Sequence, residues 1–287
     1  MKLVELGTTG EKIPVLGQGT WGIKNSKSKE YYEKWITTLK KGIELGLTHI
    51  DTAEFYGFGA SEKTVGKAIA GYNRDDLFIT SKLFPMHLRY NKMKKAAYKS
   101  LKRLGISNFD LYLIHWPSPL TSIKKQMKIM QDLVNEGKTR YIGVSNFSIE
   151  QFKKAQTYLD DKLVNNQLLA NISKQKHINE SLPYYQKEGI TMTAYSPLGH
   201  SGFTNLKGEN REKLEKIARK HNATVQQIAI AWLINHERVI TIPKAFNLEH
   251  IDANIKAIEI KLSQAEILSL YNTPEISQKI KLISSID

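Results

Sequence analysis

Hydrophobic positions along the chain follow two spacings that alternate. Short apolar runs, such as residues 77–82 and 109–114, have the length and composition of strands buried on both faces of a parallel sheet. Longer segments between such runs repeat apolar residues every three or four positions, as helices with one buried face do. Residues 29–45 show this spacing, with Trp35 and Leu39 on the predicted buried face. The alternation predicts an α/β protein.

The strand-helix alternation continues along most of the chain. We expect strands over residues 15–19, 47–51, 77–82, 109–114, 140–144, 163–167, 190–195 and 238–242. We expect helices over residues 29–45, 61–70, 92–104, 121–135, 148–158, 182–188, 224–235 and 249–258. Residues 2–6 and 12–15 flank a glycine turn and predict a β-hairpin. The pattern predicts an α/β fold of one domain over residues 1–287, a (β/α)8 TIM barrel with a short N-terminal β-hairpin and an extra C-terminal helix. A doubly wound open sheet is the alternative.

Composition changes this picture little. Of 287 residues, 41% are hydrophobic and 24% charged, which is typical of globular proteins that dissolve in water. No apolar run approaches the roughly 18 residues of a membrane helix, and residues 1–7 lack a signal-peptide core. The absence of cysteine excludes disulfides and cysteine metal sites. These features favour a cytoplasmic monomer without a metal ion or a membrane partner.

The formal charge of +14 raises the question of a polyanionic partner. Basic surfaces attract nucleic acids, but the lysines are scattered through helical segments such as 92–102 and 124–128, and no nucleic-acid motif accompanies them. We therefore expect a solvated lysine-rich surface and no nucleic-acid partner. A basic field also suits a dinucleotide cofactor.

Three glycines in the first strand region match the spacing of a dinucleotide-binding fingerprint, at Gly17, Gly19 and Gly22. The fingerprint requires a helix to begin at the glycines. Here polar residues 24–29 intervene, and the helix is expected from near Ser28. A glycine-rich turn after a strand is the favoured interpretation.

Reactive side chains end three successive predicted strands. Asp51, Lys82 and His115 lie 31 and 33 residues apart, and one βα unit takes roughly 30 residues or more. Parallel α/β folds place their chemistry at the carboxyl ends of strands. A buried carboxylate at Asp51 requires a cationic partner, which Lys82 can supply. The spacing predicts that these residues and Tyr56, on the loop after Asp51, meet at one end of the barrel.

This arrangement resembles the aldo-keto reductase family, whose catalytic tetrad matches Asp51, Tyr56, Lys82 and His115. Singly, each residue has an ordinary explanation: a surface tyrosine, a solvated lysine, a core histidine. The resemblance implies that Tyr56 is the general acid, Asp51 the anchor of Lys82, and His115 the group that orients the substrate. A free tyrosine titrates near pH ~10, and we expect the Lys82 ammonium to lower the pKa of Tyr56.

Further segments extend the resemblance over nearly the whole chain. The family segments matched by residues 143–147 and 194–199 hold the nicotinamide, with Tyr195 stacked on its ring. The cofactor contacts that the resemblance implies are Gly19, Thr20, Trp21, Ser145, Asn146, Gln167, Tyr195, Ser196, Leu198, Gly199, Lys244, His250 and Asn254. The substrate contacts that it implies are Trp21, Phe55 and Trp116.

Residues 242–254 resemble the family's site for the adenosine 2′-phosphate. Lys244 matches the phosphate lysine and Asn254 an adenine contact, but Ala245 replaces the usual serine and His250 a common arginine. The grip on the 2′-phosphate is therefore expected to be weaker than in typical members. The chain also ends soon after Tyr271, where many members carry a longer loop over the substrate, so their specificity is not carried over.

The prediction that follows is an oxidoreductase that prefers NADPH over a more weakly bound NADH. It would reduce aldehydes, with ketones as further candidates, by direct hydride transfer to small-molecule carbonyl substrates. One alternative is an NADP-dependent alcohol or sugar dehydrogenase working in the oxidative direction. Another is a cofactor-binding regulatory subunit resembling potassium-channel β subunits, which the lack of a long N-terminal extension disfavours.

Overall fold

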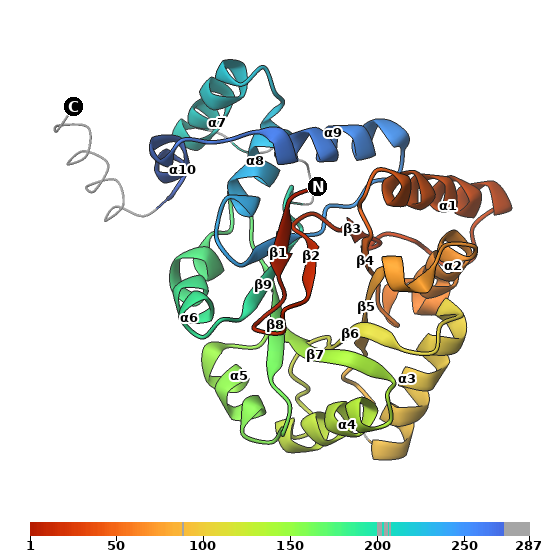
Figure 1. Ribbon diagram of the computed structural model, residues 1–287. Helices are drawn as coiled ribbons and strands as arrows, with labels where there is room; N and C mark the ends of the chain where they lie inside the picture. The colour runs from red at the N-terminus through yellow and green to blue at the C-terminus, as the bar shows by residue number, and fades with distance from the viewer. Residues whose placement is uncertain (88, 200–202, 204–205, 207, 273–287) are drawn as a thin grey trace.

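Helices surround a ring of strands in the computed structural model, which describes residues 1–87, 89–199, 203, 206 and 208–272 (Figure 1). The strands are β1 Leu3–Glu5, β2 Lys12–Pro14, β3 Gln18–Gly19, β4 His49–Asp51, β5 Phe78–Leu83, β6 Phe109–Ile114, β7 Thr139–Ser145, β8 Leu163–Leu169, β9 Thr191–Tyr195 and β10 Val239–Thr241. The helices are α1 Lys29–Glu44, α2 Ala60–Ile69, α3 Tyr90–Leu104, α4 Ile123–Asn135, α5 Ile149–Gln156, α6 Leu182–Lys187, α7 Glu209–Lys220, α8 Val225–Ile234, α9 Leu248–Glu259 and α10 Gln264–Ser269.

Eight parallel strands close into a barrel. The sheet runs β10-β9-β8-β7-β6-β5-β4-β3, and its two ends meet through parallel bridges from Leu16 to Thr241 and from Gly19 to Lys244. A side chain at Gly19 would collide with the carbonyl oxygen of Ile242, so glycine permits the close approach that joins the ends. The predicted (β/α)8 barrel is confirmed, and the open-sheet alternative is wrong.

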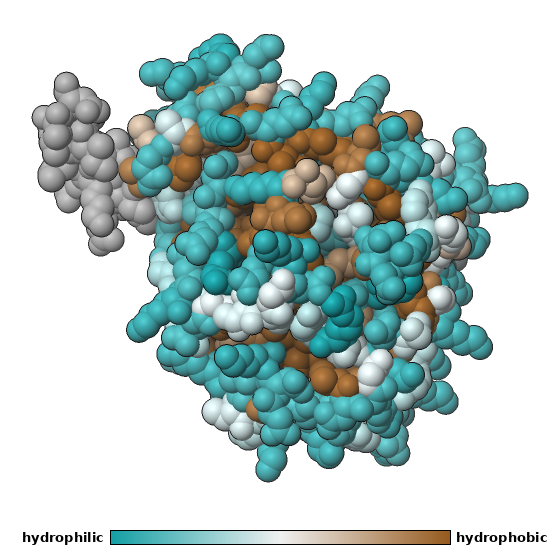
Figure 2. Space-filling model, viewed as in Figure 1, coloured by the Kyte–Doolittle hydropathy of each residue, from teal (hydrophilic) through white to brown (hydrophobic). Residues whose placement is uncertain are grey.

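The N-terminal hairpin, β1 paired antiparallel with β2, packs against the interior of the barrel. Leu6 and Ile13 join Leu111, Leu113 and Ile240 from the strands in one buried cluster. In Figure 1 the hairpin crosses the middle of the barrel. Figure 2 shows mostly hydrophilic side chains over the same face of the molecule. The hairpin thus covers one end of the barrel, and the opposite end remains open for an active site.

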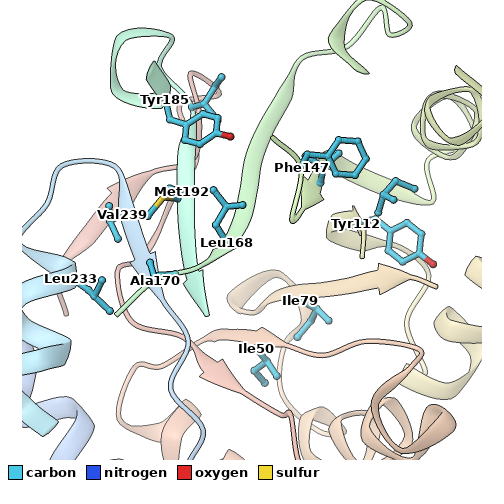
Figure 3. Close-up of a cluster of buried hydrophobic side chains, with 14 of the residues drawn as sticks. Ile50, Ile79, Tyr112, Phe147, Leu168, Ala170, Tyr185, Met192, Leu233 and Val239 are labelled. Carbon is cyan, nitrogen blue, oxygen red and sulfur yellow. The ribbon is translucent and has the colours of Figure 1, made fainter. Parts of the chain in front are cut away.

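A shell of apolar side chains fills the space between the strands and the helices. Ile50, Ile79 and Tyr112 come from neighbouring strands, and Leu168 and Met192 continue the shell around the barrel (Figure 3). All five side chains are at most 1% exposed. Burial of this kind stabilises by about 25 cal/mol per Å² of apolar surface, so the outward strand residues hold the helices in place.

The start of α1 confirms that the early glycines form a turn rather than a dinucleotide-binding loop. Ser28 caps α1, and its hydroxyl accepts a hydrogen bond from the amide of Tyr31. Residues 20–28 contain no helix between Gly19 and this cap. The first helix therefore begins too late for its N-terminus to hold a phosphate at the glycines.

Helix α7 is the element that the sequence pattern did not predict. It lies between β9 and α8, and only three of its twelve residues are buried: Leu214, Ile217 and Ala218. A pattern this sparse does not separate a helix from a polar loop. The predicted extra C-terminal helix is α10, capped by Ser263. Residues 273–287, which belong to the expected single domain, lie outside the described residues.

Within the described residues, no helix has both the length and the apolar character that a membrane span requires. The same residues contain no group of three or more metal-ligating side chains that could hold a metal ion.

Candidate active site

The four tetrad residues lie at the carboxyl ends of three neighbouring strands. Asp51 is the last residue of β4, Lys82 is the fifth of six residues in β5, and His115 directly follows β6. Tyr56 begins a short 3-10 turn after β4. The spacing along the sequence becomes proximity in space because consecutive parallel strands pair in register.

Lys82 is the centre of the site. Its ammonium donates hydrogen bonds to Asp51 Oδ1 at 2.6 Å, to the carbonyl oxygen of Thr52 at 2.9 Å and to Tyr56 Oη at 3.2 Å. The side chain is 0% exposed, so all three donors of the ammonium are used inside the protein. The second oxygen of Asp51 accepts a bond from Gln167 Nε2 at 2.8 Å. Full pairing of this kind offsets the cost of burying two charges.

A sharp turn aims Tyr56 at Lys82. Gly57, Phe58 and Gly59 follow it with φ of 56°, 53° and 90°, and three successive left-handed residues reverse the chain within a few ångströms. A side chain at Gly57 would collide with the backbone of Ile23. The turn therefore requires glycine at its start and leaves the Tyr56 ring buried.

Burial raises the pKa of Tyr56 well above its usual value, and the charge of Asp51 raises it further. The net pKa is therefore raised, whereas the Lys82 ammonium was expected to lower it. The physical reason is that Asp51 offsets the Lys82 charge while desolvation disfavours the phenolate. Tyr56 is consequently a neutral phenol that keeps its proton at every working pH. Burial also lowers the pKa of Lys82, against the opposing charge of Asp51.

His115 is a neutral imidazole beside the phenol. Burial, followed by the Lys82 charge, lowers the pKa of His115 to about 2. Its ring centroid lies 5.6 Å from that of Tyr56, and its Nδ1 has no hydrogen-bond partner among the described residues. A neutral imidazole offers one donor and one acceptor, so it can bind a carbonyl oxygen without carrying charge into the site.

The expected nicotinamide contacts form one hydrogen-bonded group at the ends of β7, β8 and β9. Ser145 Oγ donates to the carbonyl oxygen of Gln167 at 2.8 Å and accepts from Asn146 Nδ2 at 3.0 Å. Asn146 Oδ1 accepts from Tyr195 Oη at 2.9 Å, and Asn146 Nδ2 also lies 3.1 Å from the carbonyl oxygen of His115. The group touches the tetrad at two points, at His115 and through the bond from Gln167 to Asp51.

The expected pyrophosphate contacts lie in a turn after β9. The amide of Gly199 donates to the carbonyl oxygen of Ser196 at 2.9 Å, and Leu198 is half-buried within the turn. Ser196 has a φ of 51°, and its carbonyl accepts a bond from Asn171. Turns with left-handed residues can present backbone amides to anions.

The segment expected to hold the 2′-phosphate leads into α9. Lys244 is exposed just beyond β10, and His250 is exposed in the first turn of α9. The amide of His250 donates to the Asn247 side chain that caps the helix, while Asn254 is buried. An exposed lysine before a helix N-terminus suits an anion.

Of the predicted contacts in the first strand region, two have structural roles. Gly19 forms the barrel seam described above. Thr20 is fully buried, and its hydroxyl donates to the carbonyl oxygen of Asp51 at 2.8 Å and accepts from Ser61 at 2.7 Å. Trp21 is 53% exposed and packs edge-on against the Tyr56 ring, with centroids 5.1 Å apart.

Comparison with known proteins identifies the family to which this site belongs. The sequence profile described as "Aldo/keto reductase family" matches residues 15–272. The chain belongs to the aldo/keto reductase family.

Individual relatives agree with this assignment. The chain is 35% identical to methylglyoxal reductase YeaE of Escherichia coli (strain K12), with 90% of each chain covered. The structure also matches that of a thermostable aldo-keto reductase, Tm1743, in complex with the inhibitor epalrestat. Their TM-score is 0.88 at 43% identity, covering 94% of this chain and 98% of the other. An aldo-keto reductase from Klebsiella pneumoniae in complex with NADPH has a TM-score of 0.84 at 33% identity, covering 94% and 93% of the two chains.

Phe55, Phe84 and Trp116 pack together and form an aromatic wall in this aldo-keto reductase. Phe84 was not predicted from the sequence. Phe84 stacks on Phe55 with ring centroids 4.9 Å apart and an interplanar angle of 3°. Phe84 also meets Trp116 edge to face at 5.4 Å, and Phe58, 83% exposed, contacts Phe55 at 5.9 Å. The sequence does place Phe84 near the site, because Phe84 follows Lys82 by two positions at the same strand end. The predicted substrate contacts Phe55 and Trp116 thus share one wall with Phe84.

Glu54 is a second residue that was not predicted. Its carboxylate accepts a hydrogen bond from the amide of Phe84 at 3.1 Å and lies 3.1 Å from His87 Nε2. These contacts tie the turn that carries Tyr56 to the segment after β5. Glu54 therefore connects the turn that carries Tyr56 to the aromatic wall of Phe55, Phe84 and Trp116.

Proposed function

We propose that this aldo-keto reductase reduces aldehydes, and ketones more slowly, by direct hydride transfer with NADPH preferred to NADH and with Tyr56 as the general acid. The observation that carries the proposal is the position of Lys82 Nζ, bonded at once to Asp51 Oδ1 and Tyr56 Oη beside the neutral His115. A proton donor, a cation to stabilise its conjugate base and an orienting imidazole are the groups that carbonyl reduction requires.

Each residue of the tetrad has one task in this proposal. His115 donates a hydrogen bond to the carbonyl oxygen and polarises it. The phenol of Tyr56 then delivers its proton from Oη to the same oxygen as negative charge develops there. The Lys82 ammonium, already 3.2 Å from that Oη, stabilises the phenolate that remains. Asp51 holds the ammonium in place.

The residues toward the cofactor fit a nicotinamide dinucleotide. The Ser145, Asn146 and Gln167 side chains supply the donors and acceptors that match a carboxamide, and the half-buried ring of Tyr195 can lie against a flat ring. When bound, the reduced nicotinamide supplies the hydride for the carbonyl carbon. Lys244 would provide the cation for the 2′-phosphate, which NADH lacks. The NADPH complex of the Klebsiella relative and the methylglyoxal reductase name of the Escherichia relative support this cofactor and substrate class.

The proposal is tested by following NADPH absorbance with a panel of aldehydes and ketones, for the parent and for Tyr56→Phe. We expect the parent to consume NADPH and Tyr56→Phe to lose turnover by about 10² or more, the general-acid range. The dissociation constant of NADPH should be nearly unchanged, because the ring remains. Tyr98→Phe, which alters an exposed tyrosine of α3, is the matched control. A parent that reduces no carbonyl compound, or full turnover in Tyr56→Phe, would contradict the proposal.

A further inference from the structure

A basic pocket opens in the segment after β5, two residues beyond Phe84. Its volume is about 370 Å³, and it is lined by Met86, His87, Arg89 and Lys92. Three of these four side chains can carry positive charge, and no carboxylate lines the pocket among the described residues. The pocket therefore presents an electropositive surface to a ligand.

The charges of this pocket are only partly used within the protein. His87 lies 3.1 Å from Glu54, whose carboxylate also accepts the Phe84 amide. Arg89 and Lys92 are exposed, and neither forms an ion pair or side-chain hydrogen bond with another described residue. Two cationic groups thus remain to bind an anion from solution.

The ring of Phe84 contacts both the aromatic wall and a residue that lines the pocket, His87. The ring of Phe84 stacks on Phe55 at 4.9 Å on the side of the wall, and it meets the His87 ring at 5.9 Å on the side of the pocket. Glu54, which contacts His87, precedes Tyr56 by two residues. A ligand whose carbonyl reaches Tyr56 along the aromatic wall can therefore place its far end in the pocket.

The pocket is separate from the region expected to bind the cofactor phosphates. It follows β5, whereas Lys244 follows β10, and in the closed barrel β3 and β4 lie between these two strands. The charges of Arg89 and Lys92 are therefore not explained by the 2′-phosphate.

We propose that this pocket is an anion subsite that holds a carboxylate at the far end of an apolar or aromatic carbonyl substrate. The inference rests on the proposed function, because it concerns the substrate of that site. Arg89 can bind a carboxylate through two parallel hydrogen bonds, and Lys92 adds a second cation. The substrate class is then an aldehyde or ketone with a flat apolar body and an anionic end.

The test compares pairs of aromatic aldehydes that carry a carboxylate at increasing distance from the aldehyde, each paired with its neutral primary amide. For the best pair, the parent should prefer the carboxylate in kcat/KM. Arg89→Gln and Lys92→Gln should each reduce this preference by about fivefold, the upper range for an exposed ion pair. The loss should fall on KM with kcat unchanged, because the contact is equal in ground and transition states. Added salt should weaken the preference in the parent.

Lys95→Gln is the matched control, since it removes one positive charge from the exposed surface of the same helix. It should leave the preference unchanged. An equal effect of Lys95→Gln would show that only the general basic field acts, and would overturn the subsite. So would a parent without any preference for the carboxylate.

Binding separates failure of the subsite from failure of the proposed function. Calorimetry with the NADP⁺ complex and the alcohols that correspond to the carboxylate-bearing aldehydes of the panel requires no turnover. Weaker binding to Arg89→Gln than to the parent supports the subsite even if no aldehyde is reduced. Equal binding to both overturns the subsite, whatever the outcome of the aldehyde panel.

Discussion

At the scale of single residues, the site depends on the three hydrogen bonds of the Lys82 ammonium. Burial of an ion pair is costly unless each partner is fully bonded, and here both members are, since Asp51 also accepts from Gln167. The same pairing limits how far Lys82 can lower the pKa of Tyr56, and burial and the charge of Asp51 together hold that pKa above its usual value. The Lys82 ammonium, hydrogen-bonded to Tyr56 Oη, still stabilises the phenolate relative to a site without this cation.

Lys82→Met should abolish this arrangement. The variant lacks the cation for the phenolate and leaves Asp51 buried without a counter-charge. We expect turnover at pH 7 to fall by about 10² or more and the free energy of unfolding to fall by about 3 kcal/mol. Steady-state kinetics and urea unfolding measure the two effects. A folded Met variant with parental turnover would show that Lys82 has no part in the reaction.

The parent should lose reductase activity at alkaline pH below the usual lysine range. Burial lowers the pKa of Lys82 from its value in the unfolded chain, near 10.5. As the pH rises through the lowered pKa, the ammonium becomes neutral and can no longer stabilise the phenolate. A pH profile of kcat with an alkaline limb below 10.5 is expected.

His115, neutral above about pH 2, should contribute no step to this profile between pH 5 and 8. An imidazole NMR titration of His115 in that range would contradict its assigned state.

At the scale of elements, a buried carboxylate on β6 joins neighbouring strands at the end of the barrel away from the site. Asp110 is 2% exposed and accepts bonds from the amide of Ile79 at 2.7 Å, from Arg74 at 2.6 Å and from Arg140 at 3.0 Å. It thereby links β5, β6, β7 and the turn before β5. Strands rise about 3.3 Å per residue, so Asp110 lies roughly 17 Å along β6 from His115.

Asp110→Asn should therefore destabilise the fold without altering catalysis. The amide keeps the size of the side chain but removes the charge that holds two arginines, both partly exposed. We expect the free energy of unfolding to fall by about 2 kcal/mol, less than for a fully buried pair, with kcat/KM unchanged. Asp75→Asn, at an exposed neighbouring position, should change neither quantity. A loss of kcat/KM in Asp110→Asn at full stability would contradict the separation of the two barrel ends.

At the scale of the whole molecule, buried neutral histidines should make the fold sensitive to acid. Burial lowers the pKa of His49 to about 4, and that of His115 to about 2. An unfolded histidine titrates near 6.5. Between pH 6.5 and 4 the unfolded chain therefore binds protons that these two folded side chains do not. Stability is greatest above pH 6.5 and is lost as the pH falls, by up to about 1.4 kcal/mol per pH unit for each histidine.

Urea unfolding at several pH values between 7 and 4.5 measures this dependence. His49→Gln removes one of the histidines whose pKa burial lowers and should make the slope shallower. His250→Gln, at an exposed position on α9, should leave the slope as in the parent. If the parent and His49→Gln lost stability with the same slope, His49 would not be the buried neutral group that its surroundings indicate.

The sequence by itself determined the succession of strands and helices and predicted that Asp51, Lys82 and His115 meet at one end of the sheet. Apolar runs and helical spacing are local properties, and units of about 30 residues leave parallel strands few ways to pair. Reactive side chains at successive strand ends must then share one end of the barrel. For Asp51, Lys82 and His115 the positions along the chain were sufficient, because each follows directly from where its own strand stops.

Only the tertiary structure decided the features that depend on distant neighbours. The bond from Gln167 to Asp51 joins residues 116 positions apart, and the direction of the Tyr56 pKa follows from burial and from Asp51 together. The seam at Gly19 depends on a backbone that arrives more than 220 residues later. The role of Glu54 is evident only from its contacts with Phe84 and His87, and the stacking of Phe84 on Phe55 likewise requires the folded structure. Such contacts produce no periodic spacing of hydrophobic residues in the sequence, because they arise from the packing of complete elements. Strands and helices do produce such spacing, because they depend on the order of neighbouring residues.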